Sequence, residues 1–371
     1  MQNQNLIYQI GITLVKGIGN IIAKQIVENL ENPELLFKEK PRLLERIPGI
    51  SSRILQEIKN PEVLKRAEQE ILFIEKNKIS PFFITEPGYP QRLKEYVDAP
   101  MILYYKGNAD LNASKIISIV GTRHATSYGK EITQTLLKDL AVAYPDVLVV
   151  SGLAYGIDIA AHKAALQENL PTVGVLAHGL DRIYPFQHRS IAVEMLGNGG
   201  LLTDFPSGTN PDRQNFVKRN RIVAGISDCT IVVESASKGG ALITANIASS
   251  YNKDIFAVPG KTNDLYSQGC NKLIKEKKAA LVENAEDVMR EMCWDKVKEE
   301  KPQAIQRTIF YDLSPDEQSV MDILSKTESM HLNILAIELN MPVSKLSVVL
   351  FDMEMNGIIR CMPGGMYRLP C

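Results

Sequence analysis

The chain has 371 residues, of which 45% are apolar and 23% charged, a composition that is typical of globular proteins and excludes a disordered or fibrous chain. Its 42 Lys and Arg against 43 Asp and Glu leave a formal net charge of −1, which excludes a protein that is cationic overall but allows a local basic pocket. The length suffices for two or three domains.

The sequence pattern favours a cytoplasmic protein. The chain starts without a basic segment leading into an apolar run, and no stretch approaches the roughly 18 consecutive apolar residues of a membrane span. The five cysteines are too scattered along the chain to predict a zinc site or a disulfide framework, so we expect no bound metal.

Residues 1–78 are predicted to form a small helical domain, because apolar side chains recur at helical spacing. Two similar glycine-containing breaks, 16–20 and 47–51, interrupt the helices and resemble the turns of a helix-hairpin-helix, although Ser51 replaces the second glycine of the second copy. Such turns either bind a phosphate or only allow tight helix packing, and the sequence leaves both interpretations open.

Residues 79–292 alternate between short β-branched runs, Gly-rich turns and helical patterns, which indicates βαβ units and a parallel sheet. The predicted buried strands are 116–120, 147–150, 172–176, 229–233 and 255–258. Two further strands, 81–84 and 101–106, are expected to flank them.

The charged segment 293–311 has no apolar period and is predicted to be a linker. Residues 312–371 then have the order of a winged helix, three helices followed by a β-hairpin. The first helix is expected to open at a capping box, Ser314 and Glu317, with Pro315 at its first position. The predicted helices are 315–325, 332–339 and 344–356, and the predicted strands are 358–361 and 366–369.

Several turns that follow the predicted strands combine glycines, hydroxyl groups and cations, and the carboxyl ends of the strands are where such a sheet binds ligands. Helix N-termini and guanidinium groups there suit several phosphates in a row. The candidate residues are Gly121, Thr122, Arg123, Ser151, Gly152, Gly156, Lys218, Arg219, Asn220, Arg221, Gly239, Gly240 and Thr244.

These residues can also be explained by purely structural roles. The glycines are also compatible with tight turns alone, and Arg219 and Arg221 with a solvated or ion-paired helix face. Asp158 is expected to be a helix-start carboxylate, and His162 a packed core histidine. No Gly-x-Gly-x-x-Gly follows the first strand and Lys238 precedes its glycines, so we expect neither NAD nor a P-loop nucleotide, and no cofactor.

Together these stretches resemble the bacterial DNA-processing protein A family, also called DprA or Smf. The matching motifs span about residues 80–285 and are 89–100, 121–123, 151–158, 179–185, 219–222, 239–244 and 258–260. Departures from the family pattern are His188, where asparagine is expected, and Ala241, where serine is common.

The resemblance implies an α/β fold with an extended Rossmann-like, doubly wound, mainly parallel sheet between the helical and winged-helix domains. It also implies a homodimer that binds single-stranded DNA without sequence preference, protects incoming DNA and loads the RecA recombinase during natural transformation, with Gly121, Thr122 and Arg123 in the DNA pocket.

The competing hypothesis is an enzyme, because this Rossmann variant is similar to that of the lysine decarboxylase-like phosphoribohydrolases. Those enzymes carry a catalytic glutamate where this chain has Asn246, so hydrolysis would lack its acid/base group. We therefore expect no enzymatic activity. The winged helix is expected to bind a protein partner or to have a regulatory role, and not to bind DNA, because residues 310–371 carry four cations and eight carboxylates.

Overall fold

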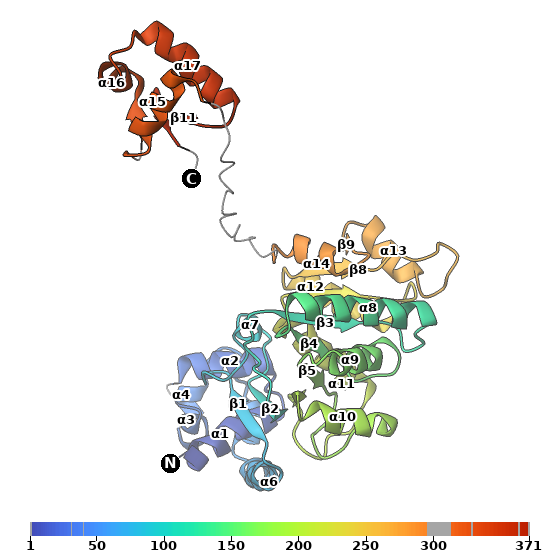
Figure 1. The fold of residues 1–371 in the computed structure, drawn as a ribbon. Helices are drawn as coiled ribbons and strands as arrows, with labels where there is room; N and C mark the ends of the chain where they lie inside the picture. Colours follow the sequence, from blue (N-terminus) through green and yellow to red (C-terminus); the bar gives the residue numbers. More distant parts are fainter. Residues whose placement is uncertain are drawn as a thin grey trace. The chain divides into compact units, whose positions relative to one another are not determined.

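The computed structural model describes residues 2–30, 32–39, 41–294, 313–327, 329–362 and 364–369 (Figure 1). The chain divides into two compact units, Met1–Asp295 and Lys296–Cys371. Apart from residues 293 and 294, the expected linker 293–311 lies outside the described residues, and the predicted domain boundary near residue 78 falls inside the first unit.

The N-terminal part of the first unit is helical. Its helices are α1 (Gln2–Leu14), α2 (Asn20–Asn29), α3 (Glu34–Lys38), α4 (Pro41–Leu44), α5 (Ser52–Ile58) and α6 (Pro61–Asn77). The glycines of the two expected turns have positive φ, +92° at Gly17 and +88° at Gly49, and each faces an isoleucine of the other turn-helix pair, Ile54 and Ile22 respectively. A side chain at either glycine would therefore press on that isoleucine, which favours the packing interpretation of these turns.

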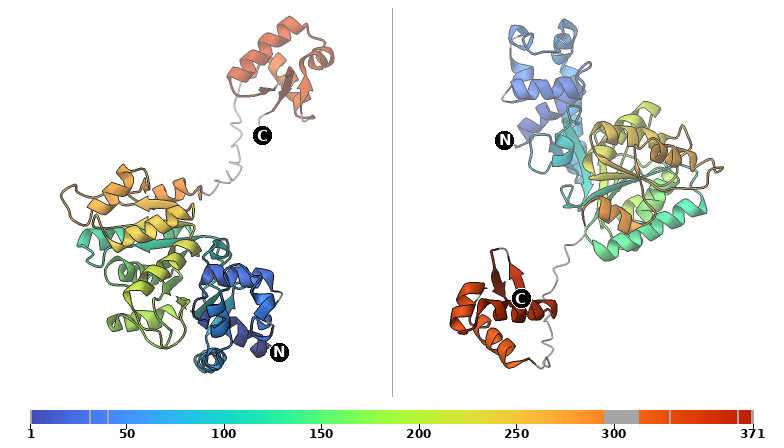
Figure 2. Two further views of the ribbon diagram at one scale, coloured as in Figure 1. Left: turned by 180° about the vertical axis from the view of Figure 1, so that it is seen from behind. Right: turned by 90° about the horizontal axis from the view of Figure 1, so that it is seen from above.

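A nine-stranded sheet forms the centre of the described first unit (Figures 1 and 2). Its spatial order is β1-β2-β6-β5-β4-β3-β7-β8-β9, parallel from β6 to β9, with β1 and β2 antiparallel at one edge. The strands are β1 (Ser80–Phe83), β2 (Ile102–Gly107), β3 (Ile116–Val120), β4 (Leu148–Ser151), β5 (Thr172–Val175), β6 (Gly199–Thr203), β7 (Cys229–Val232), β8 (Asp254–Ala257) and β9 (Ala280–Leu281). The doubly wound, mainly parallel α/β fold expected from the sequence is confirmed.

Strand β6 was not predicted, because it starts with two glycines. Gly199 has a φ of +143°, and a Cβ there would overlap the Thr172 carbonyl of β5. A Cβ on Gly200 would overlap the Tyr105 ring of β2. The glycines thus allow close approach of the strands on both sides, at the point where the sheet changes from parallel to antiparallel.

Helices cover both faces of the sheet (Figure 2). The helices that follow strand β1 in the first unit are α7 (Gln91–Lys94), α8 (Ser127–Ala143), α9 (Ile157–Gln167), α10 (Arg189–Met195), α11 (Arg213–Ile226), α12 (Gly240–Ser250), α13 (Gln268–Lys275) and α14 (Ala285–Glu291), with a 3₁₀ turn at Phe186–His188. Alternate residues of β3 divide the core: Ile117 and Ile119 pack with α8, α9 and α14, whereas Ile116 and Val120 pack with α11 and α12. This is the alternation that a strand buried on both faces requires.

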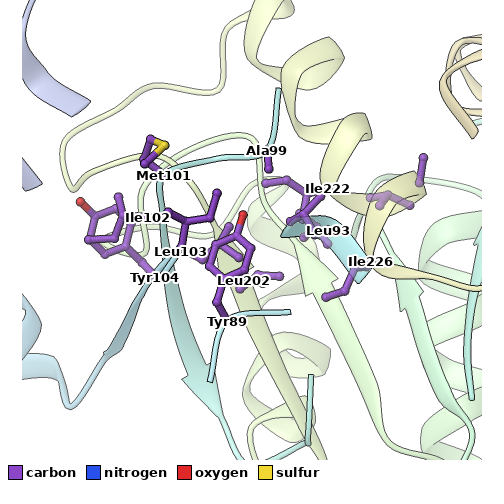
Figure 3. Close-up of a cluster of buried hydrophobic side chains, with 14 of the residues drawn as sticks. Tyr89, Leu93, Ala99, Met101, Ile102, Leu103, Tyr104, Leu202, Ile222 and Ile226 are labelled. Atoms are coloured by element: carbon purple, nitrogen blue, oxygen red, sulfur yellow. The ribbon is translucent and has the colours of Figure 1, made fainter. Parts of the chain in front are cut away.

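The segment between β1 and β2 fixes α11 against the sheet (Figure 3). Tyr89 is fully buried and its hydroxyl donates to the Pro100 carbonyl at 2.7 Å. Leu93, also fully buried, lies where a side chain on Gly225 of α11 would be. Arg92 pairs with Asp228, which follows α11, at 2.6 Å, and Asp228 accepts the backbone N–H of Ile116 at the start of β3. Helix α11 is therefore held at its C-terminal end.

The second unit has the predicted winged-helix order. It contains α15 (Pro315–Leu324), β10 (Met330–His331), α16 (Leu332–Glu338), α17 (Val343–Met355), β11 (Arg360–Met362) and β12 (Met366–Arg368), with the sheet order β10-β12-β11. The expected capping box of Ser314 and Glu317 is present. Leu335, Leu346 and Leu350 are fully buried in its core.

Within the described residues, no single helix is long and apolar enough to cross a membrane. The two consecutive helices α16 and α17, which meet at a bend of 111°, reach the required length and apolar composition when taken together.

A buried carboxylate connects the N-terminal helices to the loop between β6 and α11. Glu70 of α6 is 1% exposed, and its carboxylate accepts the Ser207 backbone N–H at 2.9 and 3.0 Å and the Ser207 hydroxyl at 2.6 Å. Arg66 pairs with Glu70 at 2.8 Å and donates to the Ser207 carbonyl. The loop that leads into α11 is thus held at its N-terminal side.

Replacing Glu70 by alanine should lower the free energy of unfolding by about 2–4 kcal/mol, because the change leaves the Ser207 N–H and the Arg66 guanidinium without their buried acceptor. Glu62→Ala on the same helix is the matched control, since Glu62 pairs with Lys65 in an exposed contact and its loss should cost less than about 1 kcal/mol. Urea unfolding measures both, and equal losses in the two variants would show that Glu70 does not hold the loop.

Candidate nucleic-acid interface

One cavity of the described first unit lies where the strand order reverses. Strands β3 and β7 are neighbours in the sheet, although three strands separate them in sequence, and ligands of such sheets bind at this reversal, outside the carboxyl ends of the strands. A cavity of about 590 Å³ opens there, which we call the first cavity. The turns after β3, β4 and β7 and the helices α11 and α12 line it.

The first cavity is positively charged. Four cations line it, Arg123, Arg213, Arg219 and Lys238, and Asp158 is the single carboxylate among the described residues of its lining. Formal charges therefore sum to +3 in a recess with apolar walls, where electrostatic interactions are stronger than in bulk water. An anion is the ligand that this charge favours.

Arg219 is the least exposed of these cations, at 4%. A Cβ on Gly152 would overlap its guanidinium, so the glycine of the turn after β4 leaves the space that the arginine occupies. Within the described residues the Nε atom of Arg219 has no hydrogen-bond partner, and no carboxylate lies within ion-pair distance of this side chain. Burial lowers the pKa of Arg219, an effect that Asp158 offsets and Arg123 increases.

Asp158 faces Arg219 without forming a close ion pair. It is 8% exposed, and burial raises its pKa although the charge of Arg219 and hydrogen bonds from the turn lower it. One of those bonds comes from the backbone N–H of Ala154, at 3.4 Å. As expected, Asp158 lies in the first turn of its helix, α9. Its hydrogen bond also closes the turn after β4.

Two guanidinium groups lie close to the ring of Phe216 of α11. The Arg123 guanidinium lies 5.1 Å and that of Arg219 5.9 Å from the centre of its ring. The half-exposed Tyr184 ring lies 6.0 Å away. Cations at the ring are attracted to its π-electrons, so Phe216 holds both arginines at the cavity wall without neutralising them.

The loop that carries Arg123 is fixed by Glu234, which follows β7 and is 1% exposed. The Glu234 carbonyl accepts the Thr122 N–H at 2.7 Å, and its carboxylate accepts the Thr126 N–H at 2.9 Å and the Thr126 hydroxyl at 2.5 Å. Thr126 in turn caps α8. Because the backbone on both sides of Arg123 is held, its guanidinium starts from a defined position.

The glycines differ in their roles. Gly156 has a φ of +79°, and a Cβ there would overlap the Thr122 carbonyl, which accepts the Ile157 N–H at 3.1 Å. A Cβ on Gly121 would overlap Ile157. These two glycines therefore allow the turns after β3 and β4 to pack against each other. Gly240, by contrast, has no atom within 4 Å of an added Cβ and borders open space.

Eight of the thirteen candidate residues line the first cavity: Gly121, Thr122, Arg123, Arg219, Asn220, Gly239, Gly240 and Thr244. The other five do not. Gly152 accommodates Arg219, and the buried Ser151 hydroxyl donates to the Ile119 carbonyl at 2.6 Å. Lys218 is exposed and Arg221 pairs with Asp98. Gly156 lines a neighbouring cavity. Contact of any of them with DNA stays a prediction.

Sequence reasoning did not select Arg213 and Phe216, which also line the first cavity. A signal existed for Phe216, because a residue three positions before Arg219 lies near it on the same face of a helix. Arg213, six positions before Arg219, had no such signal. The two departures from the family pattern also have defined places. His188 is buried and its Nδ1 lies 2.8 Å from the Leu153 carbonyl, whereas Ala241 lines the first cavity.

Comparisons with known proteins agree with this arrangement. The family model of DNA recombination-mediator protein A matches residues 80–293, and the DprA winged helix domain matches residues 302–365. The chain belongs to the DNA recombination-mediator protein A family. The resemblance expected from the sequence motifs is thereby confirmed.

Among its relatives, DNA processing protein DprA of Streptococcus pneumoniae is 37% identical over 72% of this chain and 93% of the relative. The X-ray structure of DprA from that species has a TM-score of 0.64 at 32% identity and covers 77% of this chain and 97% of its own. A structure of DNA processing protein A from Helicobacter pylori, which concerns the single-stranded DNA binding mode of that protein, has a TM-score of 0.53 at 30% identity and covers 59% of this chain and 97% of its own.

His162, on α9 behind the first cavity, gives a prediction about pH. It is fully buried, its Nδ1 lies 2.7 Å from the Thr172 hydroxyl, and burial lowers its pKa to about 3 from the ordinary 6.5. The unfolded chain therefore binds a proton that the folded chain excludes, so this contribution to stability is complete above pH 6.5 and is lost as the pH falls.

Between pH 7 and pH 5 this titration should cost about 2 kcal/mol of unfolding free energy. Urea unfolding of the wild type and of His162→Gln at both pH values measures it as a difference between the two pH dependences. His124→Gln, at an exposed histidine, should keep the wild-type dependence. Identical dependences in the wild type and His162→Gln would contradict the prediction.

Proposed function

We propose that the first cavity binds single-stranded DNA through its phosphate backbone, without sequence preference. The observation that carries the proposal is Arg219, a buried cation without a close counter-ion in a cavity of net charge +3. A buried charge without a partner is costly, and a phosphate that enters the cavity removes this cost while it neutralises Arg123 and Lys238. Binding of this kind releases counter-ions and weakens with salt.

Phe216 gives the reason to propose a single strand. The partly exposed Phe216 ring in the cavity lining offers stacking surface to an unpaired base, and every base has a π-face, so the contact tolerates any sequence. In a duplex the bases are stacked on one another and present only their edges. The Helicobacter pylori relative, studied for its single-stranded DNA binding mode, supports the same assignment.

We further propose that the protein acts in DNA processing during natural transformation, where it protects the bound strand and passes it to RecA. The name of the family, DNA recombination-mediator protein A, supports this role. A homodimer would offer two first cavities to one strand, and the second binding event would then be intramolecular and raise the overall affinity.

A hydrolase is not favoured. Asn246, which stands in the place of the catalytic glutamate of phosphoribohydrolases, is an exposed residue of α12 outside the lining of the first cavity. Asp158 is the carboxylate that lines the first cavity. It accepts a hydrogen bond from the turn after β4 and interacts with the charge of Arg219, so it already has a structural role. We therefore propose binding without a chemical step.

The winged helix is proposed to contact a protein and not DNA. Its third helix, α17, exposes Val348, Phe351 and Met355, and its Lys345 is paired with Asp316 at 2.6 Å. A helix that reads a DNA groove needs cationic or amide side chains on its exposed face, whereas apolar side chains are typical of a protein contact.

Arg123→Ala should weaken binding to single-stranded oligonucleotides of every sequence by about 1–3 kcal/mol and flatten the dependence of affinity on salt, because one phosphate contact is lost. A salt titration of fluorescence anisotropy on single- and double-stranded oligonucleotides measures both effects. Lys138→Ala, at an exposed lysine of α8 outside both cavities, is the control. An unchanged affinity in folded Arg123→Ala would refute the site.

Removal of residues 302–371 should leave the affinity for single-stranded DNA nearly unchanged, because residues 310–371 carry a net charge of −4 that repels phosphate. The same anisotropy assay checks this, with the oligomeric state verified by light scattering. A loss of tenfold or more at an unchanged oligomeric state, about 1.4 kcal/mol, would assign DNA contact to the winged helix.

A further inference from the structure

A second cavity of about 600 Å³ adjoins the first. It lies between the beginnings of α8 and α9, and Arg123 belongs to the lining of both cavities. The residues used below, Lys130 of α8 and Lys163 and Tyr155 of the α9 region, line the second cavity and not the first. It is therefore a separate recess that shares Arg123 with the first cavity.

The second cavity is cationic and lacks counter-charges. Arg123, Lys130 and Lys163 line it, and no carboxylate is present in its described lining. Within the described residues none of these three side chains forms an ion pair, although eleven other pairs occur. Two lysines from different helices thus converge on one recess with their charges unbalanced, which is an arrangement that attracts an anion.

Tyr155 adds an aromatic surface to this recess. The residue is 42% exposed, its hydroxyl donates to Gln187 Oε1 at 3.0 Å, and its ring packs edge-on to that of His188 at 5.0 Å. The ring is therefore fixed at two points while much of its surface faces solvent. A side chain that is already ordered loses little conformational entropy when a ligand stacks on it.

We propose that the second cavity is a second nucleotide subsite for the strand held in the first. The strand passes Arg123, its next phosphates lie against Lys130 and Lys163, and a base stacks on Tyr155. This rests on the proposed function, and it adds the direction in which the strand leaves the first cavity. Backbone cations and an aromatic platform are the two elements that unspecific single-strand sites combine.

The subsite makes affinity depend on oligonucleotide length. An oligonucleotide of about 5 thymidylates is short enough to occupy mainly the more cationic first cavity, whereas one of about 15 fills both. The double variant Lys130→Ala/Lys163→Ala should then lose about tenfold in affinity for the long oligonucleotide and less than twofold for the short one. Arg123→Ala, which belongs to both cavities, should weaken binding of both lengths.

The role of Tyr155 is tested with two variants, one that removes the ring and one that keeps it. Tyr155→Ala should weaken binding of the long oligonucleotide about fivefold or more, whereas Tyr155→Phe keeps the ring and should retain most of the wild-type affinity. Lys138→Ala, on the same helix as Lys130, is the control for an unspecific loss of positive charge and should bind both lengths like the wild type.

The outcomes separate the two proposals. If the wild type and the double variant bind the long oligonucleotide equally well, the second subsite is overturned and the proposed function still stands. An equal loss on both lengths would also overturn it, because the lysines would then act on the first cavity through their general field. Wild type that binds neither oligonucleotide would refute the proposed function itself.

Discussion

The burial of the Arg219 guanidinium is the constraint on which the arrangement of the first cavity depends. A cation that is 4% exposed needs compensation, and Asp158 supplies it from a distance, without a close ion pair. Gly152 provides the space that the guanidinium fills, and α11 is held at both ends, through Asp228 on one side and through Ser207 on the other. The first unit thus buries a cation at a position where an apolar side chain would cost less free energy of folding. The cavity beside this cation is suited to an anion.

A second feature is the division of roles among the residues of the turns. Gly121 and Gly156 bring the turns after β3 and β4 together, and Glu234 fixes the backbone on both sides of Arg123. Arg123 can therefore serve two cavities from one defined position. Because the scaffold is ordered before any ligand arrives, little of the binding free energy is spent on ordering it. In the proposed binding mode, the two cavities form a path for a polyanion along the carboxyl edge of the sheet.

Much of the fold could be predicted from local pattern, because buried β-branched strands such as 116–120 are distinctive in sequence. Strand β6 was missed because it starts with glycines, which are not typical of strands. They are needed there because the neighbouring strands β5 and β2 leave no room for a side chain, and this tertiary contact leaves no mark in the local sequence pattern. The same holds at the site. Gly121, Thr122 and Arg123 could be predicted because they directly follow a strand. Phe216 and the lysines of the second cavity were not predicted, because only the packing of helices α8, α9 and α11 brings them to the cavities.

The most direct test of the central claim is the melting temperature of Arg219→Met with and without a saturating single-stranded oligonucleotide. If the main role of Arg219 is to bind an anion, the free variant should melt within about 5 °C of the wild type. An apolar side chain then replaces a poorly compensated charge, and Asp158, whose pKa burial already raises, takes up a proton more readily once Arg219 is gone. The rise in melting temperature that the oligonucleotide produces in the wild type should be largely lost in the variant. A free variant that melts more than about 5 °C lower and is still stabilised by the oligonucleotide as the wild type is would show that Arg219 serves the fold and not the ligand.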